Sequence, residues 1–385
     1  MNRRFCCVGA GFSGAVLART LAEAGFPVLV AEERGHVAGN CHTERDAATG
    51  VMVHRYGPHI FHTANEQVWS YVNRFAAFRP YINRVKAVVG GRMFTLPINL
   101  LTLNQFFGRV MGPDEARAWL ASEARDDITN PANFEEQALA LVGERLYRAF
   151  FEGYTRKQWG REPRELPAAI LKRLPVRFSY DDNYFDHPHQ GIPEGGYTAL
   201  VGGILDHPAI EVRLSCRFEA LEESFRHVFW SGPLDRWFAC RAGRLDYRTL
   251  DFERIERDGD FQGTAVINWC DEAVPWTRSV EHKHFAPWEA TELPRTVVFR
   301  ERSRAAGAED TPFYPVRLAE GEARLATYRA MAAATRGVSF LGRLGTFRYL
   351  DMDVTIAQAL AAGKEVLACL REERPIPPFL AGASV

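Results

Sequence analysis

The sequence of 385 residues predicts an α/β fold whose parallel sheet is interrupted by a helical domain and by an antiparallel sheet. Three observations predict it. Two short apolar runs suited to buried strands flank a helical pattern near the N-terminus. A long helical pattern follows from about Leu101 to Tyr154, and strand patterns return from Phe178 onward. A single sheet domain would not need so much interleaving.

The composition excludes several classes of protein. Lys and Arg number 47 and Asp and Glu number 48, so the formal net charge is −1, without the basic excess usual for nucleic-acid binding. The sequence has no run of about 18 apolar residues and no secretory signal pattern at its N-terminus. The 7 cysteines lack metal-ligand spacing and indicate free thiols in a reducing compartment. We therefore expect a cytoplasmic protein with no metal, nucleic-acid partner or integral membrane segment.

A glycine-rich turn joins the first predicted strand, residues 4–8, to the first predicted helix, residues 13–24. Gly9 permits the tight turn, Gly11 lets the backbone approach a pyrophosphate, and Gly14 lets helix and strand pack closely. The helix N-terminus offers free N–H groups and the positive end of its dipole to phosphates. The order of strand, glycines and helix therefore predicts a Rossmann-like dinucleotide-binding fingerprint.

The nucleotide loop extends beyond the acidic residue that follows the second strand. Glu32 ends the predicted strand Val28–Ala31 and can accept hydrogen bonds from ribose hydroxyls. The stretch Glu33–Asn40 then continues the loop, which favours FAD over NAD, because Arg34 can reach the adenosine phosphate and Gly39 allows another close backbone approach. The predicted cofactor-binding residues of this region are Gly9, Gly11, Ser13, Gly14, Glu32, Arg34, Gly39 and Asn40.

Local patterns predict the remaining elements. A hairpin is predicted over Val85–Leu96, with Gly90 and Gly91 at its turn. Strand patterns recur later in the chain, at 211–214, 227–230, 245–252, 264–268 and 296–299. Two helical patterns enclose a further strand and loop, with the helices at 318–334 and 353–371 and the strand and loop at 340–347.

The order of these elements predicts three domains. A Rossmann-like FAD-binding domain takes residues 1–76, 198–240 and 313–385. It is interrupted by a helical domain, residues 97–177, and by an antiparallel sheet domain, residues 77–96, 178–197 and 241–312. The strand that ends at Trp230 is expected to point toward the cofactor crevice.

Four later motifs fit together. Gly57–Thr63 places two histidines three residues apart, and Tyr154–Gly160 puts two aromatic residues and two cations into seven positions. Phe313–Val316 and Gly342–Asp353 complete the set. With the FAD fingerprint, this order resembles the bacterial UDP-galactopyranose mutase family over nearly the whole chain. One departure is Ala38, where the family usually has glycine, and alanine is expected to be tolerated there if its φ is negative.

The resemblance implies an isomerase that interconverts UDP-galactopyranose and UDP-galactofuranose without net redox change. It implies reduced FAD as a covalent catalyst, whose N5 attacks the anomeric carbon while UDP leaves. It also implies a homodimer and a mobile lid near residues 163–177 that closes on UDP and excludes water.

The resemblance also assigns substrate residues. Two arginines would grip the diphosphate with their planar forks and three tyrosines would donate to it: Arg173, Arg278, Tyr184, Tyr314 and Tyr349. Tyr154 would stack on uracil with Phe151 beside it, because residues three apart share one side of a helix. The remaining members of the set would line the lid side or serve the sugar pocket, namely Trp159, Asn83, Arg248 and Asn268.

The same resemblance implies further contacts to the flavin. His59 and His62 would lie near its ring, and Arg343 would contact its pyrophosphate. The helix beginning near Asp353 would aim its N-terminal dipole at flavin O2, with the Met352 N–H as donor. Tyr349 and Asp351 complete the cofactor set. The candidate catalytic residues are His62, Arg173 and Arg278.

Three other functions share parts of this pattern. An amine-oxidase-type flavin oxidoreductase would have the N-terminal fingerprint but an apolar or cation-binding cleft. A nicotinamide-dependent dehydrogenase would lack the extended nucleotide loop and the Gly342–Asp353 motif. A flavin-binding sensor of sugar nucleotides would keep the binding residues without turnover.

Overall fold

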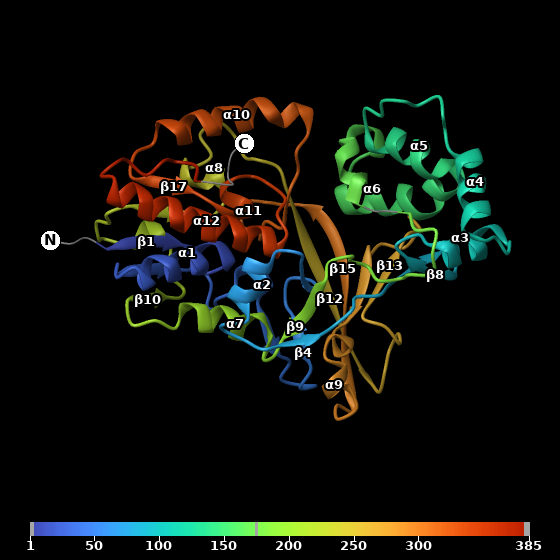
Figure 1. Ribbon diagram of the computed structural model, residues 1–385, viewed down its shortest axis with the longest axis horizontal. Helices are drawn as coiled ribbons and strands as arrows, with labels where there is room; N and C mark the ends of the chain where they lie inside the picture. Colours follow the sequence, from blue (N-terminus) through green and yellow to red (C-terminus); the bar gives the residue numbers. More distant parts are fainter. Residues whose placement is uncertain (1–3, 174–175, 381–385) are drawn as a thin grey trace.

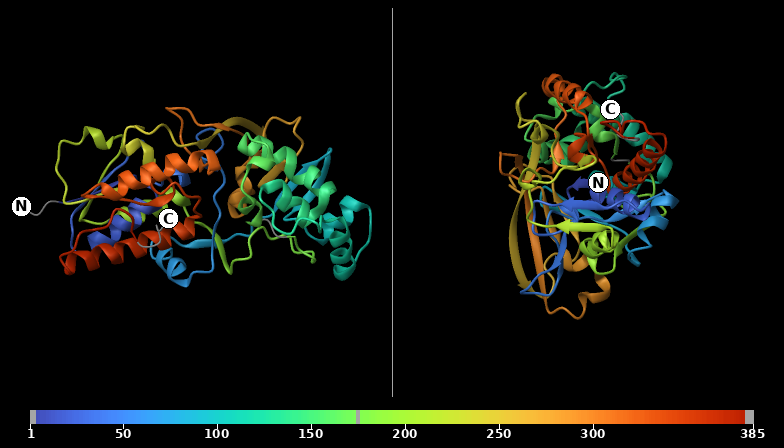
Figure 2. Two further views of the ribbon diagram at one scale, coloured as in Figure 1. Left: turned by 90° about the horizontal axis from the view of Figure 1, so that it is seen from above. Right: turned by 90° about the vertical axis from the view of Figure 1, so that its left-hand side faces the viewer.

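The computed structural model describes residues 4–173 and 176–380, and of residues 172, 173, 319 and 320 only the backbone. Figure 1 shows two bodies, one built on a parallel sheet and the other on helices α3–α6, with the long strands β12 and β15 running between them. The first described strand, β1 (Phe5–Val8), and the last described helix, α12 (Met352–Arg371), both belong to the parallel-sheet body. Seen from above in Figure 2, the two bodies lie at opposite ends of the long axis.

The parallel sheet has five strands in the order β10 (Ile210–Arg213), β2 (Val28–Ala31), β1 (Phe5–Val8), β11 (Val228–Trp230) and β17 (Val338–Phe340), and every neighbouring pair is parallel. Four of these strands lie within one residue of their predicted positions. The fifth, predicted at 340–347, begins earlier, and after Phe340 the chain turns into the short helix α11 (Gly342–Gly345). The predicted Rossmann-like fold is therefore confirmed.

Helices cover both faces of this sheet. On one face, α1 (Phe12–Glu23) packs against α7 (Gly196–Leu205) and α12 (Met352–Arg371). A Cβ at Gly363 of α12 would lie 2.5 Å from a methyl of Thr20, so glycine allows the two helices to approach. On the other face, α10 (Ala319–Ala334) and α8 (Leu234–Trp237) bury Leu325, Tyr328 and Leu234. Alternate strand residues feed the two cores, as expected for a doubly wound sheet.

A second, seven-stranded sheet stands between the two bodies. Its order is β16 (Tyr314–Pro315), β12 (Tyr247–Asp258), β15 (Arg295–Ala305), β14 (Arg278–Glu281), β13 (Val266–Trp269), β7 (Val85–Val89) and β8 (Arg92–Leu96). Only the β13–β7 pair among these described strands is parallel. The hairpin predicted at 85–96 is confirmed, with positive φ at both turn glycines.

The two longest strands of this sheet exceed their predictions. The sequence predicts strand only over 245–252 and 296–299, whereas β12 and β15 pair as far as Asp258 with Arg295. Their outer halves carry charges that pair across the strands, such as Arg304 with Asp251. Polar residues on both faces hide the alternating pattern that marks a strand.

The helical body follows the predicted helical pattern but breaks it into short pieces. These are α3 (Leu100–Phe107), α4 (Pro113–Glu123), α5 (Phe134–Leu146), the π-helical turn η2 (Tyr147–Glu152), α6 (Gly153–Trp159) and the 3₁₀ turns η3 (Pro163–Glu165) and η4 (Ala168–Arg173). Gly143 kinks α5 with φ +74°, and a side chain there would collide with the backbone of Glu123. An apolar cluster that includes Phe134, Leu146 and Phe150 joins these pieces.

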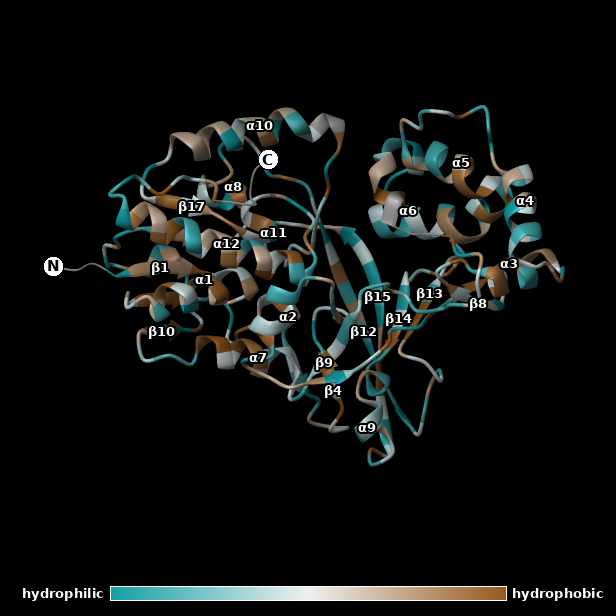
Figure 3. Cartoon of the chain, viewed as in Figure 1, coloured by the Kyte–Doolittle hydropathy of each residue, from teal (hydrophilic) through white to brown (hydrophobic). Residues whose placement is uncertain are grey.

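Smaller elements fill the joints between the sheets. The two small sheets are β3 (Thr43–Arg45) with β4 (Met52–His54), and β5 (Phe61–Thr63), β9 (His189–Pro193) and β6 (Phe78–Pro80). The remaining helical turns are η1 (Gly39–Cys41), α2 (Glu66–Val72), η5 (Phe218–Ala220), η6 (His282–Phe285) and α9 (Pro287–Ala290). Figure 3 shows helices that mix polar and apolar residues, and within residues 4–173 and 176–380 no helix is long and apolar enough to cross a membrane.

The domain boundaries predicted from the sequence remain a prediction. Strands from both sides of a predicted boundary share sheets, since β16, from the predicted FAD-binding domain, pairs with β12 of the large sheet.

Candidate functional site

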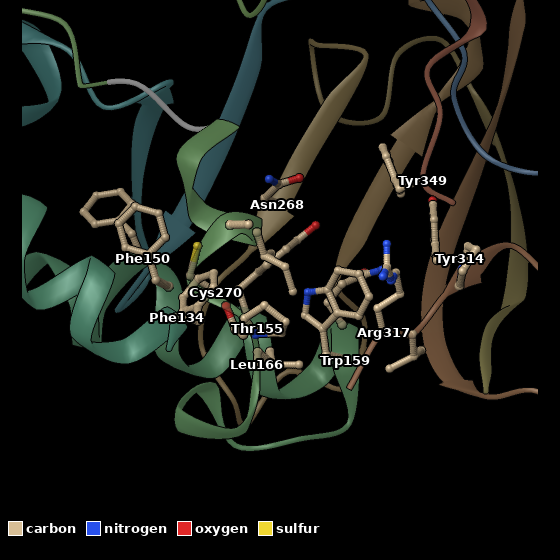
Figure 4. Close-up of a pocket in the computed structure, with 18 of the residues that line it drawn as sticks. Phe134, Phe150, Thr155, Trp159, Leu166, Asn268, Cys270, Tyr314, Arg317 and Tyr349 are labelled. Carbon is tan, nitrogen blue, oxygen red and sulfur yellow. The ribbon is translucent and has the colours of Figure 1, made fainter. Parts of the chain in front are cut away.

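A cavity of about 800 Å³ lies between the helical body and the large sheet (Figure 4). Its walls come from η2 and α6, from β13 and β14, and from the segments 314–318 and 348–349. Its volume is in the range of small-ligand sites. Eight of the predicted substrate residues line it: Phe151, Tyr154, Trp159, Tyr184, Asn268, Arg278, Tyr314 and Tyr349.

Three arginines line the cavity, Arg278, Arg317 and Arg348, and of these Arg278 lies on the large sheet. Its Nε donates to Glu301 Oε2 at 2.7 Å, and its Nη2 lies 2.6 Å from the same oxygen. Burial opposes the charge, but Glu301, Tyr314 and Tyr154 together hold the pKa of Arg278 well above its ordinary value. Since Glu301 is fully buried, it holds the guanidinium of Arg278 in place, and the remaining N–H groups of Arg278 are available to a ligand.

The sequence analysis missed Glu301. It faces Arg278 across the β14–β15 ladder, and no local motif connects two residues on different strands. Only the strand register brings them together. Glu301 Oε1 is buried without a hydrogen-bond partner, which leaves an acceptor beside the guanidinium.

Tyrosine hydroxyls surround this guanidinium. Burial raises the pKa of Tyr154 and of Tyr184 above the ordinary phenol value, although the positive charge of Arg278 lowers both pKa values in part. Tyr314 and Tyr349 stack with ring centroids 5.9 Å apart. Neutral phenols can donate hydrogen bonds, so cation and donors gather at one end of the cavity, as a diphosphate would require.

The other end of the cavity is apolar. Figure 4 shows Phe134, Phe150, Leu166 and Cys270 gathered there, away from Tyr314 and Tyr349. Burial raises the pKa of the Cys270 thiol to about 12, which makes it an unreactive part of the wall.

The sequence analysis also missed two polar residues on the helical wall. Thr155 and Gln158 line the cavity beside Phe151 and Tyr154. Tyr154, Thr155 and Gln158 follow Phe151 by three, four and seven residues, and this spacing places all four side chains on one face of the helix. Both Thr155 and Gln158 lie within the Tyr154–Gly160 motif, and their helical spacing from Phe151 could have predicted them.

Two asparagines predicted for the sugar pocket have unused acceptors. Asn268 lines the cavity, and its Oδ1 is buried without a partner. Asn83 is 4% exposed, its Oδ1 also lacks a partner, and its backbone carbonyl accepts the N–H of Tyr184 at 2.8 Å. Buried polar atoms without partners indicate that a ligand or water completes the site.

Arg248, also predicted for the sugar pocket, does not reach the cavity wall. Its Nε donates to the carbonyl of Gln158 and to Ser303 Oγ, each at 3.0 Å, so the guanidinium caps the C-terminal end of α6. Burial and the nearby Arg161 lower the pKa of Arg248 to about 10. A cation at a helix C-terminus interacts favourably with the helix dipole, and the sugar contact of Arg248 remains a prediction.

The predicted lid covers η3 and η4, but Arg173, predicted to hold phosphate, has its side chain outside the described residues. The described part of the lid reaches the cavity through Leu166, Ala169 and Ile170.

The glycine-rich turn forms a cradle beside the parallel sheet. Gly9 has φ +101°, and a side chain there would collide with Ser231 Oγ. A side chain at Gly14 would collide with the carbonyl of Gly9, which confirms the close helix–strand packing predicted for it. A Cβ at Gly39 would lie 3.3 Å from the Cα of Gly11, so the two backbones face each other across the cradle.

Glu32 and Arg34 lie at the rim of this cradle. The carboxylate of Glu32 accepts the backbone N–H of Ala10 at 2.8 Å and of Arg34 at 3.0 Å. The guanidinium of Arg34 lies over the ring of Tyr56 at 4.7 Å and donates through Nη2 to Asn40 Oδ1 at 3.0 Å. Its Nη1 is buried without a partner, which leaves a charged donor for a nucleotide phosphate.

Ala38 does not meet the condition set for it. Alanine was expected to be tolerated there if its φ were negative, whereas Ala38 has φ +75° and precedes η1 in the left-handed region. The carbonyl of Ala10 accepts its N–H at 2.9 Å, which fixes the backbone in this shape. An L-residue there is strained by about 1–2 kcal/mol, so the alanine is tolerated at a cost that glycine would avoid.

Burial favours the neutral forms of His59 and His62. His59 Nδ1 lies 2.8 Å from the carbonyl of Gly57, and burial lowers its pKa to about 4. His62 Nδ1 lies 2.6 Å from Nδ1 of His187, and its ring stacks on Phe185. Burial and His187 both lower the pKa of His62.

The remaining predicted cofactor residues gather around α11 and α12. Arg343 donates to the carbonyls of Phe313 at 3.3 Å and Leu350 at 2.6 Å, which ties two of the family-like motifs together. Asp351 precedes α12, and Met352 is its first residue, so the positive end of a 20-residue helix lies beside these groups. A side chain at Gly342 would collide with Ser13 Oγ, which places α11 against the start of α1.

One cluster of possible metal ligands occurs in the described part of the chain, made of Asp260, Glu281 and His284. His284 Nε2 lies 3.0 Å from Asp260 Oδ2 and 3.4 Å from Glu281 Oε2. Glu281 also accepts two backbone N–H groups, from Phe261 and Gln262. Both carboxylates raise the pKa of His284 above its ordinary value.

Comparison with known proteins identifies relatives along almost the whole chain. Residues 149–349 match the UDP-galactopyranose mutase family, and residues 7–75 match an NAD(P)-binding Rossmann-like domain. A probable UDP-galactopyranose mutase of Klebsiella pneumoniae is 53% identical over 98% of both chains. A dTDP-fucopyranose mutase of Escherichia coli is 49% identical over 92% of this chain and 95% of its own. A solved reduced UDP-galactopyranose mutase has the same fold, with a TM-score of 0.72 at 17% identity over 95% of this chain and 96% of the other.

Proposed function

Because the chain belongs to the UDP-galactopyranose mutase family, whose members are isomerases, we propose that it interconverts UDP-galactopyranose and UDP-galactofuranose. One observation carries the proposal: the cavity holds a cation, Arg278, fixed by Glu301 and surrounded by tyrosine hydroxyls. This end suits a diphosphate, and the apolar end suits a nucleoside base. An oxidase cleft for an apolar or cationic substrate would not need a fixed arginine.

The cofactor of this proposal is FAD in its reduced form. The cradle fits a dinucleotide, because glycines keep it open and Arg34 at its rim has a charged donor without a partner. Reduced FAD would supply a nucleophilic nitrogen, N5, for covalent attack on the anomeric carbon as UDP departs. The positive end of α12 at Met352 would favour negative charge on the reduced ring.

The residues of the cavity would hold UDP while it is detached from the sugar. Arg278 and the hydroxyls of Tyr184, Tyr314 and Tyr349 would bind its phosphates. Tyr154 would stack on uracil, with Phe151 beside it. Asn268 and Asn83 would offer their unpartnered oxygens to sugar hydroxyls, and Trp159 would close the wall on the lid side.

Other parts of the proposal rest on the family. Arg173 would be the second phosphate arginine, carried on a lid that excludes water when UDP binds. His59 and His62 would contact the flavin as neutral groups, beside Arg343 and Asp351. We also propose a homodimer that works in the cytoplasm.

The test is turnover of UDP-galactofuranose by the purified full-length protein, with and without dithionite, followed by chromatography. The expected result is UDP-galactopyranose in the reduced sample only. Equal turnover in the oxidised and reduced states would reject the N5 mechanism. A yellow protein that binds UDP without isomerising its sugar would favour an oxidase or a sensor.

A second candidate substrate comes from the dTDP-fucopyranose mutase relative, which covers nearly as much of the chain. Thymine carries one more methyl group than uracil, and the base end of the cavity is lined by Phe134, Phe150 and Leu166, which would accept it. Competition between UDP and dTDP for the reduced protein decides between the two. The proposed function requires UDP to bind at least as tightly as dTDP.

A further inference from the structure

The two cations of the Tyr154–Gly160 motif do not line the cavity. Arg156 pairs with Glu152, Glu162 and Glu272 at 3.0 to 3.1 Å. Lys157 points its ammonium group into the chain segment that joins β13 to β14. The function proposed above leaves this lysine without a task.

Four backbone carbonyls surround the ammonium of Lys157. Nζ donates to Trp269 at 2.6 Å, Asp271 at 2.8 Å, and Val274 and Trp276 at 3.1 Å. The segment 269–276 therefore wraps around the ammonium as it would around a small cation. Hydrogen bonds from a charged donor are stronger than those between neutral groups, so this contact resists opening of the segment.

The wrapped segment lies between two sets of cavity residues. β13 and β14, which it connects, carry Asn268 and Arg278, and α6, which carries Lys157, also carries Tyr154 and Trp159. All four of these residues line the cavity. The base-facing wall and the phosphate-facing wall thus meet at Lys157.

The backbones of α6 and the segment also touch. A Cβ at Gly153, the first residue of α6, would lie 2.6 Å from the carbonyl of Cys270 and 3.1 Å from the N of Glu272. Glycine permits this approach, and Lys157, one turn further along the helix, holds it closed. α6 continues from η2 without a break in helical backbone, and Lys157 ties its second turn to the segment.

We propose that Lys157 is a positioning residue, whose ammonium fixes segment 269–276 against α6 and so sets the distance between Tyr154 on the helix and Arg278 on the sheet. This inference rests on the proposed function for the identity of the ligand that the two walls grip. It extends that function by assigning control of UDP affinity to a residue that does not touch the cavity.

A second buried lysine supplies a matched control. Lys283 is 8% exposed and donates to the carbonyls of Gly259 at 3.1 Å and Leu293 at 2.7 Å. It belongs to η6, after β14, and holds loops that do not line the cavity. Both lysines therefore stabilise backbone carbonyls, but only Lys157 does so between cavity walls.

The experiment compares Lys157→Met with Lys283→Met in the full-length protein. Both variants are expected to melt at a lower temperature. Only Lys157→Met is expected to raise the dissociation constant for UDP, by about tenfold, as for the loss of a charged hydrogen-bonding group. Hydrogen exchange should accelerate over 269–276 in Lys157→Met and not in Lys283→Met, with or without UDP. Unchanged exchange there, or an equal loss of UDP affinity in both variants, would overturn the inference.

Chemical rescue separates a tether from general stability. Ethylammonium added to Lys157→Ala can occupy the vacated carbonyl cage, and it is expected to restore UDP affinity in a saturable manner. The same addition to Lys283→Ala should leave UDP affinity unchanged. Failure of rescue in Lys157→Ala, in a sample whose exchange pattern elsewhere matches wild type, would argue against the ammonium as the positioning group. Wild-type protein that binds UDP but does not isomerise the sugar would refute the proposed function and leave this inference standing.

Discussion

The dinucleotide cradle and the sugar-nucleotide cavity are built in opposite ways. The cradle comes from one stretch of about forty residues, and its defining feature is missing side chains, at Gly9, Gly11, Gly14 and Gly39. The cavity comes from distant parts of the chain between Leu96 and Tyr349, and its defining feature is side chains that converge around Arg278. One site therefore depends on local backbone shape, and the other on how domains and strands are placed.

The largest effect is expected from a substitution that disrupts the cradle and leaves the cavity unchanged. In Gly14→Ala the new methyl group collides with the carbonyl of Gly9 between helix and strand, which must move apart. Overpacking of this kind costs about 1–3 kcal/mol, and the purified protein should lack flavin absorbance. The control is Gly202→Ala on α7, where an added Cβ meets no atom within 4 Å. A Gly14→Ala protein that keeps full flavin content would show that the packing is less strict than the geometry indicates.

The next effect breaks the cavity and spares the cradle. Arg278→Ala removes the fixed cation and should lower kcat/KM by about 10²–10³-fold, the usual range for losing one charge-stabilising donor. Flavin content should be unchanged, because Arg278 lies in the large sheet. Steady-state kinetics with absorbance spectra of the purified variant provides the check. Loss of flavin from this variant would contradict the separation of the two sites.

A matched change in the partner of Arg278 sharpens the same point. Glu301→Gln keeps the shape of the side chain but removes the charge that holds the guanidinium. We expect a smaller fall in kcat/KM than for Arg278→Ala, because the cation remains but is free to turn. A fall equal to that of Arg278→Ala would instead assign Glu301 a direct part in the reaction.

The contrast between the two sites explains what the sequence could predict. The cradle could be predicted because glycine positions, strand and helix follow one another in the chain. Phe151 and Tyr154 on the cavity wall were found through a family-like motif. Glu301, by contrast, acquires its role only through the β14–β15 register.

Arg248 is another residue whose surroundings could not be predicted from the sequence. Its residue type suits a sugar or phosphate pocket, and the sequence does not reveal that it is buried under the end of α6. The positive φ of Ala38 was likewise hidden, because alanine rarely adopts that conformation.

A fourth prediction tests the aromatic residue Tyr154 on the helical wall of the cavity. Tyr154→Ala should weaken UDP binding by about 1–3 kcal/mol, the range for loss of an aromatic ring that stacks on a base. Tyr154→Phe keeps the ring and should bind UDP nearly as tightly as wild type. Calorimetric titration of both variants gives the comparison. Equal weakening in the two variants would assign the hydroxyl, and not the ring, to binding.

A pH series tests whether the charge on Lys157 is needed to hold the two cavity walls together. Burial lowers the pKa of Lys157 to about 8, while Cys270, Asp271 and Glu272 act to raise it. In the unfolded chain the pKa of Lys157 keeps its ordinary value of 10.5, so the unfolded state binds more protons than the folded state between pH 8 and 10.5. In this window the contribution of Lys157 to the free energy of unfolding therefore rises with pH. The same loss of charge weakens the carbonyl cage. UDP affinity should therefore fall above about pH 8 in wild type and stay flat in Lys157→Met, as titrations with UDP at each pH would show.

The smallest expected effect improves the cradle. Ala38→Gly relieves the left-handed alanine, which costs about 1–2 kcal/mol in an L-residue, although part of the gain is offset because glycine has more freedom in the unfolded chain. We expect a net gain of about 0.5 kcal/mol, seen as a small rise in the midpoint of thermal unfolding. Gly25→Ala is the reverse control, since Gly25 has φ +88° with no atom within 4 Å of an added Cβ, so any loss reports backbone strain without a steric clash. UDP affinity should not change in either variant, because both residues belong to the cradle body. A gain in UDP affinity from Ala38→Gly would show that the two sites are coupled, although no residue between 9 and 40 lines the cavity.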